Sequence, residues 1–218
     1  MTLQGEVQGA IPSLPGFDSD TIITAAAAQQ FYAAGYKFCL RYLSLAGQEL
    51  PQDLSPEEGS DILASGLALM PVQHVRRAGW LPSQNLGKHY GQDAGTNAQN
   101  VGFPAGANVW CDLEGVNSQA AQQDVIDYCE AWYAAVNAAG YIPGLYVGAR
   151  ALLNSQQLSD LSFQHYWRSL SHVPIAPSRG YQLIQFFPSI TAHGIDIDLD
   201  ATQDDQEGGQ VQWLRTAA

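Results

Sequence analysis

Short apolar runs recur along the chain from Pro15 onward, and stretches of helix-forming residues separate most of them. The runs are rich in branched aliphatic and aromatic residues, which is the composition of β-strands. Gly and Pro residues punctuate the chain between them and mark turns. Eight strands are predicted in this way, over residues 16–18, 36–43, 67–74, 108–114, 142–147, 165–170, 181–187 and 195–199.

Helices are predicted in most of the gaps between these strands. An alanine-rich stretch begins at Thr24 and stops at Gly35. The segment SPEE at 55–58 combines a capping serine, a proline at the first helical position and acids in the first turn. The other predicted helices cover residues 91–101, 118–139, 158–161 and 204–215.

Strands that alternate with helices indicate parallel βαβ units, which form either a closed barrel or an open doubly wound sheet. No Gly-rich phosphate loop follows any of the predicted strands, which disfavours the open nucleotide-binding sheet. The count of eight favours a single (β/α)8 TIM-like barrel. We expect this domain to span residues 15–218 and residues 1–14 to be an N-terminal leader or loop.

The amino-acid composition of the chain limits the classes of molecule that we expect it to bind. The chain has 218 residues, a formal net charge of −12 and only nine Lys and Arg, so we expect it to bind neither nucleic acid nor anionic membranes. No apolar run approaches the ~20 residues of a membrane span, and no standard signal peptide is visible. We therefore expect a soluble monomer. If its substrate lies outside the cell, export by a non-standard route is implied. The three cysteines sit in apolar stretches and are interpreted as buried free thiols.

Carboxylates follow the predicted strands at the ends where a parallel barrel carries its functional groups. Asp112 and Glu114 end the fourth strand. Because side chains alternate along a strand, these two acids share a face, with Cα atoms ~6.5–7 Å apart. Unpaired charge is costly to bury in a barrel core, so both belong at the rim, within reach of water and a ligand.

The first and last predicted strands carry acids as well. Asp18 ends the first strand, and Asp196, Asp198 and Asp200 lie along the eighth. The first and eighth strands are neighbours in a closed barrel, which places Asp18 beside Asp198. The pair on the fourth strand would then lie across the mouth.

Crowded carboxylates raise one another's pKa, so that one of them can stay protonated near neutral pH and donate a proton to a leaving oxygen. Glycoside hydrolysis needs such an acid and a second carboxylate that stabilises or attacks the sugar cation. The spacing alone leaves other readings open, because a DxE at a strand end also caps helices or binds metal.

Several short motifs resemble the glycoside hydrolase family 25 lysozymes: GFD at 16–18, DLE at 112–114 and IDLD at 197–200. The chain is still more similar to the related glycoside hydrolase-like domain family. That likeness rests on the alanines at 94 and 98, GFP at 102–104 and VWCDLE at 109–114.

The resemblance implies a (β/α) barrel that cleaves a β-1,4 bond in peptidoglycan or a related amino-sugar glycan. It makes Glu114 the proton donor, while Asp112 orients an acetamido group or stabilises charge. Asp18 and Asp198 would supply electrostatic stabilisation and position substrate or water, and Asp196 is an alternative for the role of Asp198.

Further rim residues are candidates for binding sugar or, equally, for packing the barrel. They are Arg41, Tyr42, Gln73, His74, Tyr146, Trp167 and Gln185. Arg41 is also a candidate partner for a rim carboxylate, and His74 a candidate base.

No metal or other cofactor is expected. Residues 196–207 imitate a calcium loop, but Ala201 stands where that loop needs glycine. Two alternatives to the hydrolase stay open. One is a catalytically inactive glycan-binding or interaction domain on the same barrel, and the other is an open-sheet enzyme of different chemistry.

Overall fold

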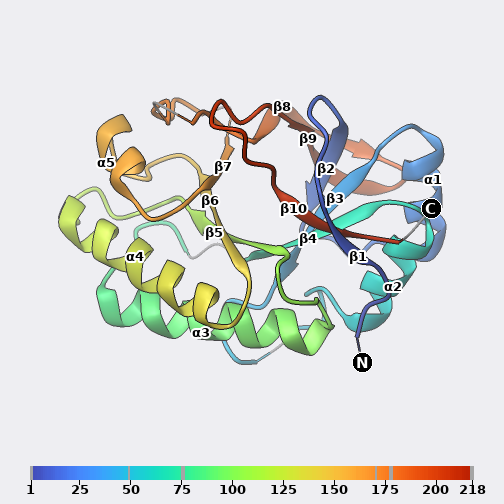
Figure 1. Ribbon diagram of the computed structural model, residues 1–218, viewed down its shortest axis with the longest axis horizontal. Coiled ribbons are helices and arrows are strands. Elements are labelled where there is room, and N and C mark those ends of the chain that lie inside the picture. The colour runs from blue at the N-terminus through green and yellow to red at the C-terminus, as the bar shows by residue number, and fades with distance from the viewer. Residues whose placement is uncertain (1, 49, 75–76, 170, 177–178, 217–218) are drawn as a thin grey trace.

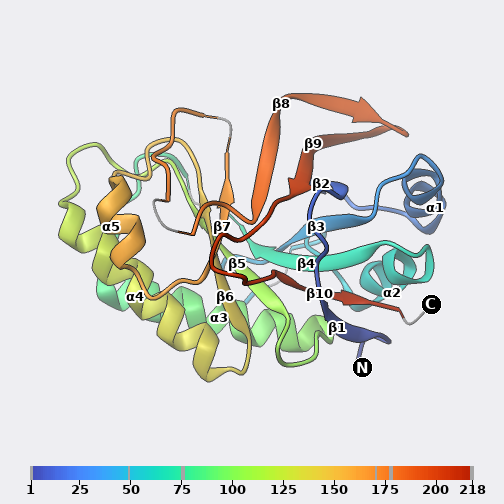
Figure 2. The same cartoon turned by 45° about the horizontal axis from the view of Figure 1, so that its top comes forward.

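The computed structural model describes residues 2–48, 50–74, 77–169, 171–176 and 179–216. Eight strands close into a barrel in which each pairs with the next along the chain and the last pairs with the first, which confirms the predicted fold. Figures 1 and 2 show the barrel with its helices outside it. The strands are β2 (Pro15–Ser19), β3 (Phe38–Leu43), β4 (Ala68–Gln73), β5 (Asn108–Leu113), β6 (Ile142–Val147), β7 (His165–Arg168), β8 (Leu183–Ala192) and β9 (Ile195–Thr202).

The last barrel strand runs in the opposite direction from the others. Strands β2 to β8 are parallel, whereas β9 is antiparallel to both β8 and β2. The cause is the connection: only His193 and Gly194 separate β8 from β9, and both have positive φ, as a two-residue hairpin turn requires. A parallel return would need a crossover of a dozen or more residues.

Five helices are found in the described part of the chain: α1 (Ala25–Ala33), α2 (Pro56–Ala64), α3 (Gln84–Val101), α4 (Gln122–Ala138) and α5 (Ser155–Asp160). The predicted caps of the first two are confirmed, because Thr24 and Ser55 accept hydrogen bonds from the first turns of α1 and α2. Helix α3 begins earlier than predicted, after a capping Ser83, and α4 begins later, at Gln122.

Two short strands outside the barrel were not predicted. Strand β1 (Glu6–Gly9) lies in the segment expected to be a leader or loop, and it pairs with β10 (Gln212–Arg215), which pairs in turn with β4. The helix predicted over residues 204–215 is therefore wrong. Val211 and Trp213 alternate with polar residues and pack with the apolar side chains inside the barrel, which is strand behaviour. They cover the end at which the parallel strands begin.

Alternation along each strand divides the core into two layers. Phe38, Leu40 and Trp110 belong to the cluster inside the barrel, whereas Cys39 and Cys111 belong to the cluster between barrel and helices. All three cysteines are buried and free, as predicted. The same alternation of inward and outward positions along each strand decides which polar residues near the strand ends face the mouth of the barrel.

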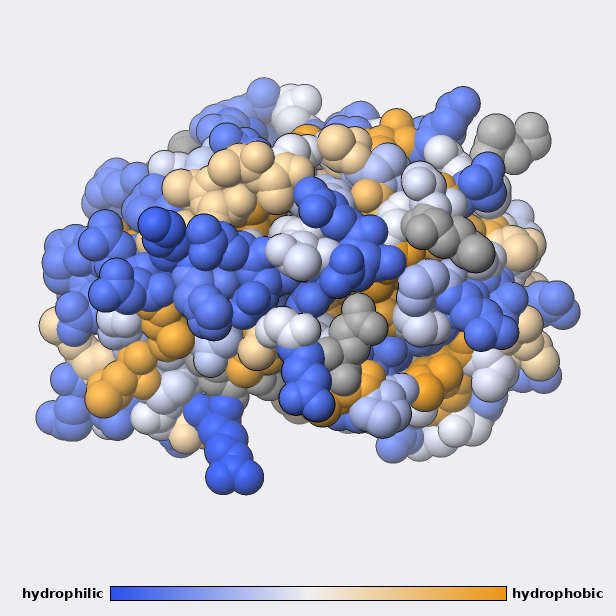
Figure 3. Space-filling model, turned by 90° about the horizontal axis from the view of Figure 1, so that it is seen from below, coloured by the Kyte–Doolittle hydropathy of each residue, from blue (hydrophilic) through white to orange (hydrophobic). Residues whose placement is uncertain are grey.

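The outer surface on the side where α3 lies is mainly hydrophilic, with smaller hydrophobic areas between the polar groups (Figure 3). Within the described residues, no helix combines the length and apolar character needed to cross a membrane.

Candidate active site

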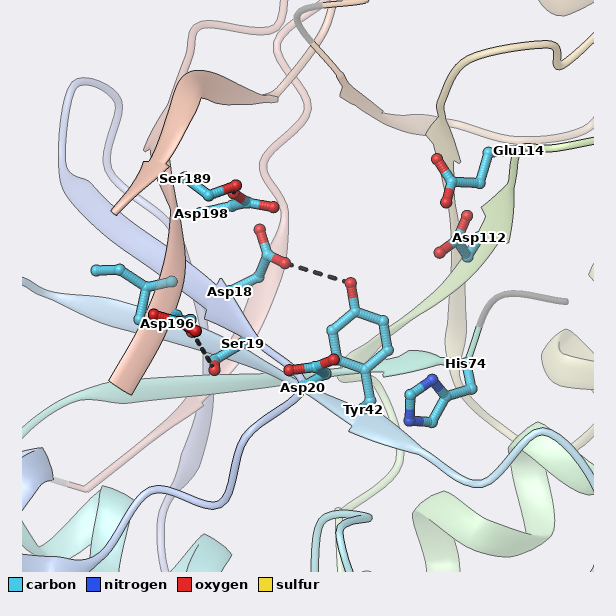
Figure 4. Close-up of a pocket in the computed structure, with 11 residues that line it drawn as sticks. Asp18, Ser19, Asp20, Tyr42, His74, Asp112, Glu114, Ser189, Asp196 and Asp198 are labelled. Atoms are coloured by element: carbon cyan, nitrogen blue, oxygen red, sulfur yellow. Dashed lines mark hydrogen bonds between the residues drawn. The ribbon is translucent and has the colours of Figure 1, made fainter. Parts of the chain in front are cut away.

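A cavity of about 270 Å³ opens where the parallel strands end. Acids from three strands and the segments that follow them face it, with Asp112 and Glu114 on one side and Asp18 and Asp198 on the other (Figure 4). Its lining consists of Asp18, Ser19, Asp20, Tyr42, His74, Asp112, Glu114, Ser189, Asp196, Ile197 and Asp198.

Asp18 and Asp198 are paired directly in the β2–β9 register, so the predicted neighbourhood of the two residues is confirmed. Gln185 on β8 links them, since its Nε2 donates to Asp18 Oδ2 at 2.8 Å and to Asp198 Oδ2 at 3.3 Å. Tyr146 OH donates to Gln185 Oε1 at 2.9 Å and thereby orients the amide. Tyr42 OH donates to the other oxygen of Asp18 at 3.2 Å.

Burial dominates the electrostatics of Asp18 and raises its pKa to about 7. The negative charge of Asp198 raises the pKa further, while hydrogen bonds from Gln185, Asp200 and Tyr42 oppose the rise. Asp198 is half-buried and accepts a short hydrogen bond from Ser189 Oγ.

Glu114 follows β5 and is held from two sides. Its carbonyl oxygen accepts a hydrogen bond from Trp80 Nε1 at 2.8 Å, which fixes the backbone. Gly148 lies against the side chain so closely that a Cβ there would stand 2.6 Å from Glu114 Oε2. Burial raises the pKa of the Glu114 carboxyl, and the charge of Asp198 raises it further. Glu114 is thus suited to carry a proton toward a bound ligand.

Asp112 lies on the same face of β5 as Glu114, as alternation predicted, and is 5% exposed. Six of the eleven lining residues that the structure describes are acids, and His74 is the only basic residue among these eleven. Burial lowers the pKa of His74 more than the nearby Asp53 raises it. The cavity therefore has a negative potential, which favours a positive charge that develops in a bound ligand.

The predicted binding residues fall into three groups. Tyr42, His74 and Asp196 line the cavity. Gln185, Tyr146 and Trp167 lie beneath it, where Gln185 and Tyr146 form the network around Asp18 and Trp167 Nε1 donates to Asp200 at 2.8 Å. Arg41 and Gln73 face the helices instead of the cavity.

The expected pairing of Arg41 with a rim carboxylate is wrong. Arg41 occupies an outward-facing position of β3 and is fully buried beneath the helices. Its Nε donates to Oε1 of Glu58 on α2 at 2.6 Å. Gln73 has the outward parity of β4, and its amide is fully used by Leu45, Tyr90 and Trp132. Both residues brace the helical layer.

Four lining residues were not predicted: Ser19, Asp20, Ser189 and Ile197. Ser19 and Asp20 directly follow Asp18, so their position after a barrel strand was an available signal. Ser189 had none, because it lies in the part of β8 beyond the predicted strand end. Over the described ranges, no group of three or more His, Cys, Asp and Glu side chains is arranged to hold a metal ion.

The barrel and its carboxylate-lined mouth define the class of glycoside hydrolase-like proteins. The family model of the Rv2525c-like, glycoside hydrolase-like domain matches residues 29–208, and the chain belongs to this family. No curated protein matches the chain at a significant level.

Solved structures share the fold at low sequence identity. The Mycobacterium tuberculosis Tat-secreted protein Rv2525c is 16% identical with a TM-score of 0.66, and the match covers 92% of this chain and 99% of that one. A B. stearothermophilus protein is 21% identical with a TM-score of 0.67, over 89% and 97% of the two chains. A bacterial lysozyme from Streptomyces coelicolor is 12% identical with a TM-score of 0.59, over 91% and 95%.

Proposed function

We propose that this protein is a glycoside hydrolase that cleaves peptidoglycan or a related amino-sugar glycan by carboxylate acid/base catalysis. The observation that carries the proposal is the convergence of Asp18, Asp112, Glu114 and Asp198 on one cavity, although they are distant in sequence. The shared fold of the Streptomyces coelicolor lysozyme supports the choice of substrate class.

Each acid takes a role suited to its surroundings. Glu114, whose pKa is raised, is the proton donor to the leaving oxygen. Asp112 beside it orients a substrate acetamido group or stabilises charge at the anomeric carbon. Asp18 and Asp198, across the cavity, act as carboxylates that stabilise the oxocarbenium-like transition state and position substrate or water.

A cell-wall substrate lies outside the cytoplasm, so the proposal requires that the protein reach it by export. The secreted M. tuberculosis protein of the same fold is consistent with such a location. We also propose that a monomer suffices, because one chain supplies all the groups of the cavity.

The test compares wild type with Glu114→Gln on purified peptidoglycan and measures released reducing ends. We expect the variant to lose about 100-fold or more of the activity, since general acid catalysis contributes about 10²–10⁴-fold. Glu6→Gln is the matched control, because Glu6 is exposed on β1, away from the cavity, and this variant should keep wild-type activity.

Two results would contradict the proposal. Equal activity of wild type and Glu114→Gln would remove Glu114 as the acid. Binding of glycan by both proteins, with no reducing ends released by either, would show a glycan-binding domain without turnover.

A further inference from the structure

A further acid, Asp200, lies one step deeper in the barrel than the six acids that line the cavity. It is paired with Gly16 and with Gln185 in the two sheet registers of β9, which makes it the diagonal neighbour of Asp18. Asp200 is 3% exposed and does not line the cavity. The roles proposed above leave this buried carboxyl without a function.

The two oxygens of Asp200 have different surroundings. Oδ1 accepts a hydrogen bond from Trp167 Nε1 at 2.8 Å. Oδ2 is buried and receives no hydrogen bond from any donor in the described residues. The carboxyl of Asp18 is the diagonal neighbour of Asp200 in the β2–β9 register, and each of the two carboxyls shifts the pKa of the other. Two ionised carboxylates in contact and away from water would repel each other strongly, so a proton is needed between them.

The hydrogen-bond donors indicate which residue carries that proton. Asp18 receives a hydrogen bond on each oxygen, from Tyr42 on Oδ1 and from Gln185 on Oδ2, and both bonds stabilise its ionised form. Asp200 receives a single hydrogen bond, from Trp167. The ionised form is therefore favoured at Asp18 and the neutral acid at Asp200.

We propose that Asp200 is a neutral carboxylic acid that shares its proton with Asp18 and acts as a positioning residue for it. Trp167 orients the acid, the hydroxyl of Asp200 donates to Asp18, and Asp18 presents its charge to the cavity. Proton sharing does not depend on the proposed function, whereas the positioning role in catalysis rests on it.

The surroundings of the pair agree with this assignment. Burial raises the pKa of Asp200 well above its ordinary value, and the charge of Asp18 and its hydrogen bond raise it further. The other titratable groups that act on the pair are Asp198 on β9, Tyr42 on β3 and Tyr146 on β6, and each of these is an acid or a phenol. Asp112 and Glu114 act on the same two tyrosines from the side of β5.

The first test needs no activity. The infrared difference spectrum of wild type minus Asp200→Asn, recorded at neutral pH in H₂O and D₂O, should contain the carbonyl band of a protonated carboxylic acid that shifts on deuteration. Asp204→Asn is the matched control, because Asp204 is exposed. Apart from the amide bands of the introduced Asn, its difference spectrum should contain carboxylate bands and no carboxylic acid band. Carboxylate bands without a carboxylic acid band in the Asp200→Asn difference would overturn the proposal.

The second test uses the pH dependence of peptidoglycan hydrolysis. An Asn side chain at position 200 can donate to Asp18 and accept from Trp167 as the neutral acid does. In Asp200→Asn, the acidic limb of the pH profile, where activity falls as Asp18 takes up a proton, should therefore lie close to that of wild type. Asp200→Leu removes the donor, and the limb should move to higher pH by about 1–2 units. An ionised Asp200 would give the opposite result, because both variants would remove a negative charge and move the limb to lower pH.

The two tests separate this inference from the proposed function. A wild type without hydrolytic activity would contradict the function, while the infrared difference would still decide where the proton lies. If Asp200→Leu does not fold, the infrared band and the pH profile of Asp200→Asn decide the matter.

Discussion

The buried ion pair between Arg41 and Glu58 gives the sharpest prediction for stability. The side chains are 0% and 4% exposed, and Glu58 Oε1 accepts from both Arg41 Nε at 2.6 Å and the backbone N–H of Ile23 at 2.8 Å. Glu58→Gln keeps the shape of the side chain but leaves a buried guanidinium without its counter-charge. Breaking such a pair costs about 3–5 kcal/mol.

Urea denaturation followed by circular dichroism measures this loss in the free energy of unfolding. For a chain of this size, a loss of about 3–5 kcal/mol lowers Tm by roughly 6–20 °C. Glu57→Gln is the matched control, because Glu57 is the exposed neighbour in the same first turn of α2. It should lose only ~0.3–1 kcal/mol, the contribution of an acid near a helix N-terminus.

The Glu58→Gln variant should also affect the candidate active site. Arg41 Nη1 donates to the carbonyl of Ser19, the residue after Asp18, at 2.5 Å. Glu58→Gln should therefore reduce hydrolysis as well as stability. A loss of less than about 1 kcal/mol in Glu58→Gln, equal to that of Glu57→Gln, would refute the view that this buried pair anchors the end of β2.

Three further predictions follow from buried groups. Folding raises the pKa of Asp18 from 3.8 to about 7. The contribution of the protonated Asp18 carboxyl to the free energy of unfolding is therefore complete below pH ~3.8 and is lost as the pH rises to about 7. Asp18→Asn should remove this loss when Tm is measured across that range. Gly144→Ala should cost about 1–3 kcal/mol in urea denaturation, because its Cβ would stand 2.4 Å from the Trp110 ring, whereas Gly47→Ala, with a nearest atom at 3.7 Å, should cost much less. The three buried thiols should react with a thiol reagent only after unfolding, since burial raises the pKa of Cys39; rapid labelling of the native protein would contradict this.

Much of the fold could be predicted from local pattern. Each of the eight barrel strands was located from its apolar run, and the caps at Thr24 and Ser55 marked two helices correctly. The end of the chain could not be read in this way. Residues 212–215 form a strand because β1 pairs with all four of them, β4 pairs with Leu214, and Trp213 packs with the apolar side chains inside the barrel.

Some residues of the candidate site were predicted correctly from the sequence and others were not. Asp18, Asp112 and Glu114 were recognised because parallel strands place their carboxyl ends on one rim. Asp198 lies within the antiparallel β9 and joins them at the cavity because it is paired with Asp18. Arg41 and Gln73 were assigned to the rim although their parity on β3 and β4 points them outward, and a strict count along each strand would have corrected this. Ser189 lies at the cavity because β8 extends past the barrel.

The sequence by itself determined where the eight barrel strands lie, which side chains alternate along them, and that carboxyls follow the first and fourth of these strands, because these follow from local spacing and composition. Only the tertiary structure decided that β10 pairs with β1 and β4, that Arg41 pairs with Glu58, and that Asp200 lies buried beside Asp18. The physical reason is that these outcomes depend on contacts between distant segments. Burial and the charge of neighbours set the protonation of a carboxyl, and neither exists until the barrel closes.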